Sequence, residues 1–242
     1  MPKALPQQRL QQLQQLLRRI DIDTSGLAST GWAAVDEALT HTSAGLAINH
    51  EQLEFLGDAV LRLAASEYLE KHHPELSVGE RSALRAQLVS DRWLAEVGEA
   101  IGISDALRIG PTAGGDATAL STLRAEATEA LIGALYRAFG SLAPVHQWLT
   151  PSWERTSRAV LSDPHRGNCK SALQEWSQAK ALGLPTYRTE ERSKRHGDPQ
   201  RFHCHVGLEG WISAEGWGGS RREAEQQAAR AALEAIKPAQ ES

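Results

Sequence analysis

The first two thirds of the chain repeat apolar residues at the spacing of amphipathic helices. The segment 7–20 has apolar residues three and four positions apart, which predicts a helix with a Gln and Arg outer face. The same spacing predicts helices over 32–39, 51–72, 79–90, 91–101, 118–139 and 143–161. Breaks are expected at Gly45, at Pro74 and in the Gly-rich stretch 110–116. Residues 1–161 are therefore expected to form an all-α domain.

The pattern changes after a short polar segment. Residues 162–168 read SDPHRGN, the composition of an exposed connector, and we set a linker at 162–167. Beyond it the sequence predicts a helix, three strands and a helix, at 169–181, 186–193, 201–208, 210–217 and 220–236. Residues 168–238 are thus expected to form a small α+β domain of order αβββα.

The second of these strands alternates two kinds of side chain. Phe202, Cys204 and Val206 would face a core, while His203 and His205 would lie on the other face. Two histidines at i and i+2 can bind a metal, although no third ligand is evident nearby in the sequence. A solvated sheet face is the simpler interpretation.

The net charge of −4 over 242 residues argues by itself against a protein that binds nucleic acid. The average conceals a division, because residues 168–237 hold 11 Lys or Arg and 9 Asp or Glu, a net of +2. The rest of the chain then has a net charge of −6. The acidic part suits metal chemistry, and the mildly basic part suits contact with RNA.

Two further features concern location. No apolar run approaches the roughly 18 residues that cross a bilayer, and the first 20 residues lack the apolar core of a secretory signal. We therefore expect no membrane association and a cytoplasmic protein. Cys169 and Cys204 stand alone without a zinc-binding pattern, and we expect buried thiols.

Acidic residues gather on two of the predicted helices. Glu51, Glu54 and Asp58 fall at i, i+3 and i+7, so one helix face carries all three, and a positive group should lie against them. Glu126 and Glu129 form a second pair at i and i+3. The opposite faces are apolar, with Leu53, Leu56, Val60 and Leu63 on the first helix and Leu123, Ala127, Ala130, Leu131 and Ala134 on the second.

If these two helices pack together, four carboxylates can meet. An all-oxygen cluster suits Mg²⁺ or Mn²⁺. Two such ions about 4 Å apart would support hydrolysis of a phosphodiester. Taken singly, however, glutamates at this spacing are most often a solvated helix face.

Sequence motifs around these glutamates favour the metal site over a solvated helix face, because they resemble those of a known family. The run EQLEFLGDA at 51–59 resembles the signature of the ribonuclease III family, and three flanking runs match in order and spacing: ALTHTS at 38–43, LRAQLVS at 84–90 and EALIGALY at 129–136. The resemblance implies an endonuclease for double-stranded RNA that depends on Mg²⁺, with Mn²⁺ able to substitute. It implies metal ligands at Glu54, Asp58, Glu126 and Glu129, with Asp58 and Glu129 the most critical and Glu51 a nearby catalytic residue. One departure is Glu126, where the family usually has Asp.

The same resemblance implies a homodimer through the nuclease domain. Phe55 and Leu56 are candidate interface residues, and ordinary core positions are the alternative for each. Products would carry 5′-phosphate and 3′-hydroxyl ends with short 3′ overhangs, and the usual task of the family is processing of ribosomal and other RNA precursors.

Residues 168–237 resemble a double-stranded RNA-binding domain, with good matches at both helices. Such domains recognise the A-form duplex by its shape. The resemblance implies RNA contacts by Ser171, Gln174 and Glu175 on the first helix and by Ser220, Arg221 and Arg222 at the start of the last. His196 either replaces the histidine that the family usually carries in the loop between the first two strands, or this contact is lost.

Several alternatives stand beside these hypotheses. Thr40, His41 and Ser43 lack the supporting turn of a nucleophilic hydrolase, and we interpret them as polar groups at a helix end. Trp176, Trp211 and Trp217 are expected in core or sheet packing, because duplex RNA hides its bases. An inactive duplex-RNA scaffold is the second functional hypothesis. A helical di-metal redox protein is the third, but the Glu-x-x-His motif that it needs does not accompany Glu51, Glu54 or Glu129.

Overall fold

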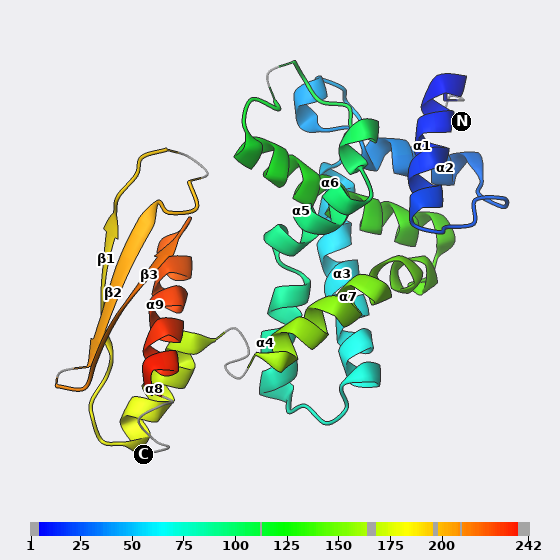
Figure 1. The fold of residues 1–242 in the computed structure, drawn as a ribbon. Coiled ribbons are helices and arrows are strands. Elements are labelled where there is room, and N and C mark those ends of the chain that lie inside the picture. Colours follow the sequence, from blue (N-terminus) through cyan, green and yellow to red (C-terminus); the bar gives the residue numbers. More distant parts are fainter. Residues whose placement is uncertain (1–4, 112, 164–167, 196–197, 209, 237–242) are drawn as a thin grey trace. The chain divides into compact units, whose positions relative to one another are not determined.

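A computed structural model describes residues 5–111, 113–163, 168–195, 198–208 and 210–236, and its contacts divide the chain into two compact units, residues 1–158 and 159–242. The elements of the first unit are helical (Figure 1). They are α1 (Gln7–Arg19), α2 (Ser29–Ala38), η1 (Thr42–Ala44), α3 (Glu51–His72), α4 (Val78–Leu88), α5 (Asp91–Ala100), η2 (Ile103–Ala106), α6 (Ala117–Phe139) and α7 (Ala143–Ser162).

The all-α prediction for this part is confirmed, and polar caps explain where several helices begin. Ser77 and Glu80 form a reciprocal capping box at α4, Ser90 caps α5, and the carboxylate of Asp116 accepts two backbone N–H groups at the start of α6. The single-turn helices η1 and η2 were not predicted, because a segment of three or four residues shows no periodicity.

The helices α3 and α6 cross in close contact at the middle of the unit (Figure 1). A Cβ atom added to Gly57 of α3 would overlap the carbonyl oxygen of Glu129, and one added to Gly133 of α6 would overlap that of Leu53. Each helix therefore supplies one glycine at which the backbone of the other passes. This reciprocal contact places the runs 51–59 and 129–136, which carry Asp58 and Glu129, beside each other.

The predicted Gln and Arg outer face of α1 is wrong at one position. Arg9 is buried, and its Nε donates to Asp36 at 2.6 Å while Nη1 donates to the carbonyl oxygen of Ala106 at 2.6 Å. Asp36 also accepts from Arg108 at 2.9 Å, so this carboxylate lies between two guanidinium groups and compensates the buried charge of Arg9. The arginine could not be assigned to the core from spacing, because its partners lie far away in the sequence.

The second unit has the predicted αβββα order. It contains α8 (Cys169–Ala179), β1 (Thr186–Glu191), β2 (Phe202–Leu208), β3 (Ile212–Gly218) and α9 (Arg221–Ile236). The strands form one antiparallel sheet in the order β1-β2-β3, in which Cys204 is opposite Thr189 and Gly216. The helix α9 packs against the sheet and α8 packs against α9 (Figure 1).

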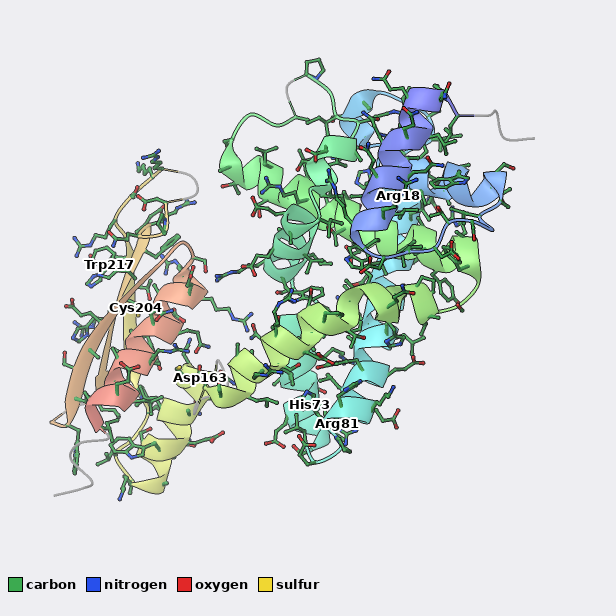
Figure 2. All side chains as sticks on the ribbon, turned by 45° about the vertical axis from the view of Figure 1, so that its right-hand side comes forward. Arg18, His73, Arg81, Asp163, Cys204 and Trp217 are labelled. Atoms are coloured by element: carbon green, nitrogen blue, oxygen red, sulfur yellow. The ribbon has the colours of Figure 1, made fainter. Side chains whose placement is uncertain are left out.

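The predicted alternation of β2 is confirmed. Cys204 and Val206 are buried in a core shared with Leu173 and the alanines of α9, and both cysteines are buried free thiols. On the other face, His203 lies 3.2 Å from the Glu215 carboxylate and His205 bonds Ser213 at 2.7 Å, as on a polar sheet face. Figure 2 labels Cys204 and Trp217 on this sheet. Trp217 packs against His203 with ring centroids 4.3 Å apart, whereas Trp211 is two-thirds exposed, which contradicts core packing for that residue.

The predicted domain boundaries stay predictions. The helix α7 ends at Ser162, and most of the proposed linker, residues 164–167, lies outside the described part of the chain, as does the end of the predicted second domain. Within the described ranges, every helix is too short or too polar to span a lipid bilayer.

Candidate metal and RNA sites

Two carboxylates of α3, those of Glu54 and Asp58, lie beside its contact with α6. Glu54 and Asp58 are one turn apart and half-buried, and Gly57 lies between them against the Glu129 carbonyl group. Asp58 accepts from Nε of Arg62 at 2.7 Å. Glu51, at the first residue of α3, is exposed.

On α6, Glu126 points toward two imidazoles. Its Oε2 atom lies 3.4 Å from Nε2 of His41 and 3.7 Å from Nε2 of His50. Nε2 of His50 is also 3.2 Å from Oε2 of Glu54, so this ring bridges a carboxylate from α3 and one from α6. In the described ranges, His41, His50 and Glu126 are the group of donors placed closely enough to share an ion as they stand.

Glu129 is the acid of the site whose pKa is shifted most. Burial raises its pKa to about 7, and repulsion by Asp58, Glu54 and Asp91 adds to the increase, which Arg62 only partly offsets. The pKa of Glu54 is raised too, first by burial. Three neighbouring carboxylates with so little compensating positive charge disfavour the ionised state of Glu129.

The structure therefore brings Glu54 and Asp58 close enough to Glu129 for both charges to raise its pKa. Glu126 joins them through His50 and through its repulsion of Glu54. Glu51 contributes only through its charge, which adds to the increase in the pKa of Glu54 and partly offsets the decrease that burial and His50 cause in the pKa of His41. The positive group expected against these carboxylates is found as Arg62, which pairs with Asp58 at 2.7 Å from the same helix.

The sequence analysis missed four members of this site. His50 precedes Glu54 by four residues and Arg62 follows Asp58 by four, so helical spacing could have found both. His41 does cap a helix end as predicted, accepting from the backbone N–H of Ser43, but its contact with Glu126 is long-range. Asp91, at the start of α5, has no local signal.

The donor set fits a divalent cation. Glu54, Asp58 and Glu129 offer only carboxylate oxygens, the ligands that Mg²⁺ and Mn²⁺ prefer. A cation among them would reverse the repulsion that raises the pKa of Glu129. The observation that supports a cation site is therefore the excess of negative charge around Glu129, which the protein leaves largely uncompensated.

This perturbation predicts how the stability of the metal-free protein depends on pH. The folded-state pKa of Glu129 is raised, so its protonated form stabilises the fold fully below the unfolded value near 4.5, and this contribution is lost as pH rises through about 7. Glu129→Gln should therefore stabilise the protein in EDTA at pH 8 by about 1 to 2 kcal/mol, discounted for solvent screening, and have little effect at pH 4. Thermal unfolding at both pH values measures this, and an equal effect at the two would contradict it.

The predicted RNA contacts of the second unit lie partly around one hollow of about 500 Å³. Ser171 and Gln174 of α8 and Arg222 of α9 line it, together with Lys170 and Tyr187. Glu175 is exposed on α8 but does not line the hollow.

The remaining predicted contacts have other surroundings. Ser220 caps α9, since its hydroxyl oxygen accepts from the backbone N–H of Glu223. The guanidinium of Arg221 lies over the Phe202 ring, 6.0 Å from its centroid, on which Arg201 also lies at 5.2 Å. His196 lies outside the described residues.

The two candidate interface residues differ in exposure. Phe55 is 84% exposed although it is a large aromatic side chain, which excludes a core position in the isolated chain. Leu56 is intermediate. Leu63, predicted on the apolar side of α3, is half exposed, so the apolar stripe of this helix continues onto the surface.

Comparisons with known proteins agree with the two-unit division. Residues 33–144 match the family model described as ribonuclease-III-like, and residues 169–236 match that of the double-stranded RNA binding motif. Ribonuclease 3 of Prochlorococcus marinus is 56% identical over 202 residues, covering 84% of this chain and 81% of that protein. A ribonuclease 3 of Synechocystis is 42% identical over 223 residues, covering 92% and 91%.

Among solved structures, the nuclease domain of ribonuclease III from Campylobacter jejuni is similar, with a TM-score of 0.50 and 26% identity. The match covers 58% of this chain and 94% of that one. That structure is described as flexible in a region involved in dimer formation.

Proposed function

Since this chain belongs to the ribonuclease III family and is an endoribonuclease for double-stranded RNA, we propose that it hydrolyses phosphodiester bonds by a two-metal mechanism with Mg²⁺. Mn²⁺ would substitute for Mg²⁺. The observation that carries the proposal is the uncompensated carboxylate cluster around Glu129, whose pKa is raised to about 7 by burial and by its acidic neighbours.

In this proposal Glu54, Asp58, Glu126 and Glu129 hold the cations. When bound, these ions would activate a water and stabilise the charge that develops on the phosphate. The part of the protein is to keep its ligands ionised and oriented. Asp58 follows Gly57, which contacts the Glu129 carbonyl group, and after burial its charge is the largest cause of the raised pKa of Glu129, which supports their role as the most critical pair. Glu51, exposed at the start of α3, would act beside the site on substrate or water.

Product ends and biological task belong to the same proposal. Hydrolysis would leave 5′-phosphate and 3′-hydroxyl ends with short 3′ overhangs, in the processing of ribosomal, messenger and other RNA precursors. A cytoplasmic location is supported by the two buried free thiols, which suit a reducing compartment.

One assay tests the nuclease. The purified chain is incubated with a long RNA duplex in Mg²⁺, and separately in EDTA, and the products are resolved by size with their ends mapped. Cleavage in Mg²⁺ alone is expected. Duplex that is bound but uncut in Mg²⁺ would contradict catalysis and favour the scaffold hypothesis.

The hollow between α8 and α9 supports RNA binding by Ser171, Gln174 and Arg222. We propose Ser220, Arg221 and Glu175 as further contacts outside it. Arg222→Ala should remove one phosphate contact and reduce the slope of log affinity against log salt by about 1. The measurement is a titration of a cleavage-resistant duplex at several salt concentrations.

A matched control for this titration lies on the sheet. Arg188 alternates on β1 with Tyr187, which packs on the core, so Arg188 lies on the face away from the helices. Arg188→Ala removes the same charge, and an equal change in slope for both variants would argue that only net charge matters.

We further propose a homodimer through the nuclease domain, with Phe55 at its interface and Leu56 beside it. The exposure of Phe55 supports this, since a single buried aromatic anchor at an interface contributes about 2 kcal/mol or more. Phe55→Asp should therefore weaken the dimer by about 30-fold or more. Sedimentation equilibrium over a concentration series measures the change, and an unaltered dimer would exclude Phe55 from the interface.

A further inference from the structure

Glu126 has neighbours that a simple carboxylate cluster does not need. The rings of His41 and His50 stack with centroids 4.8 Å apart, and both present Nε2 to the Oε2 atom of Glu126. His50 is buried and His41 is largely buried. Two imidazoles therefore form one wall of the site.

The tautomer of His41 follows from its other contacts. The backbone N–H of Ser43 donates to Nδ1 of His41 at 3.1 Å. The Ser43 hydroxyl lies 2.7 Å from the same nitrogen and accepts from the N–H of Gly110, which leaves its own proton to donate to Nδ1. With both groups as donors, Nδ1 accepts and carries no proton. The ring proton is then on Nε2, the atom that lies 3.4 Å from Glu126. Capping of η1 thus fixes His41 as a donor toward the carboxylate.

His50 connects the two helices of the site. Its Nε2 atom lies 3.2 Å from Glu54 on α3 and 3.7 Å from Glu126 on α6. The length of Glu126 matters for this arrangement, because an aspartate would withdraw the carboxylate by one C–C bond, about 1.5 Å. The glutamate reaches the imidazoles, and an aspartate would stop short of them.

We propose that His41 and His50 are positioning residues that orient the carboxylates of Glu126 and Glu54 for the divalent cation. This inference rests on the proposed function of these glutamates. Partners that orient a ligating group typically contribute 10- to 100-fold in metal affinity. The extra methylene of Glu126 is accommodated because the histidines hold its carboxylate.

Two substitutions of His41 separate this role from a structural one. His41→Asn retains an acceptor close to the position of Nδ1, so it keeps the cap on Ser43 but loses the donor to Glu126. His41→Gln retains a donor close to the position of Nε2 and loses the cap. Mn²⁺ binding to the full chain without RNA is measured by calorimetry, and thermal unfolding is measured in EDTA.

The two variants should rank in opposite order for Mn²⁺ affinity and for Tm. We expect His41→Asn to bind Mn²⁺ at least 10-fold more weakly at an unchanged Tm, and His41→Gln to bind within about 3-fold of the unsubstituted chain at a Tm lower by a few degrees. If the loss of affinity follows the loss of Tm instead, the role of His41 is structural and the proposal is overturned.

Coupling to Glu126 gives a second test. In the Glu126→Asp background the shorter side chain no longer reaches the imidazoles, so His50→Gln and His41→Asn should change Mn²⁺ affinity by less than 3-fold there. Effects equal to those in the unsubstituted chain would contradict the proposal. His146→Asn is the matched control, because His146 pairs with Glu67 at 2.8 Å in the same unit and should leave Mn²⁺ affinity unchanged.

Failure of the inference and failure of the proposed function give different results. If the carboxylates do not bind the cation, Glu129→Ala retains the Mn²⁺ affinity of the unsubstituted chain. If they do bind it but the histidines do not orient them, Glu129→Ala loses affinity and His41→Asn does not.

Discussion

Glu129→Ala is expected to lower the rate of duplex RNA cleavage by about 10³-fold or more while leaving RNA affinity unchanged. The reason is that Glu129 is half-buried and close enough to Asp58, Glu54 and Asp91 for their charges to raise its pKa, and its carboxylate is proposed to face the cation there. The RNA contacts are proposed to lie mainly in the other unit, around Gln174 and Arg222. Single-turnover cleavage and a binding titration in Ca²⁺ or EDTA measure the two quantities separately.

Glu99→Ala is a suitable control for this experiment. Glu99 is an exposed acid on α5 that pairs with Arg124, so its loss removes the same charge from the same unit. We expect cleavage within a few-fold of the unsubstituted chain. Full cleavage by the Glu129 variant would show that the catalytic site lies elsewhere.

The second large effect is expected for Gly57→Ala, which would change how closely the backbones of α3 and α6 can approach. The added methyl group would overlap the Glu129 carbonyl oxygen, which belongs to a helix and cannot move aside alone. We expect a destabilisation of roughly 3 kcal/mol or more, because overpacking a fixed contact forces the helices apart. Cleavage should be lost with it, since the same displacement separates Asp58 from Glu129. Urea unfolding followed by circular dichroism measures the stability.

Gly79→Ala provides the comparison. Gly79 lies in the first turn of α4, and a Cβ atom there would meet no heavy atom within 4 Å. The same substitution should stabilise α4 by about 0.5 to 1 kcal/mol, the usual gain of alanine over glycine in a helix. If Gly57→Ala is tolerated as well as Gly79→Ala, the crossing of α3 and α6 is looser than the structure indicates.

The order of the elements was predictable because each helix carries its own apolar period and many begin at a polar cap. The approach of the two acidic helices was predictable from the small residues beside Glu129, and the buried alanines of α6 confirm that interpretation. Each of these features follows from the pattern of residues within a short stretch of sequence, so it could be predicted without knowing contacts between distant segments.

The parts that escaped prediction depend on contacts between distant segments. Arg9 looked like a surface residue until Asp36 and Ala106 provided its partners. His41 was understood as a cap but not as a neighbour of Glu126, and Asp91 reaches the site only because α5 packs against α6. Leu63 fits the apolar face of its helix, and only the packed structure shows that this face is partly uncovered.

The buried arginine of α1 has a consequence for how much chain the nuclease unit needs. Nη2 of Arg9 is 3.4 Å from the Leu39 carbonyl oxygen, which also accepts from the backbone N–H of Arg108, whose own carbonyl oxygen accepts from the N–H of His41. The match to the ribonuclease-III-like family model begins only at residue 33, well after this helix. A fragment cut to the residues of that match would therefore lose an anchor of the loop that carries His41, and we expect an autonomous nuclease unit to need the amino-terminal helix.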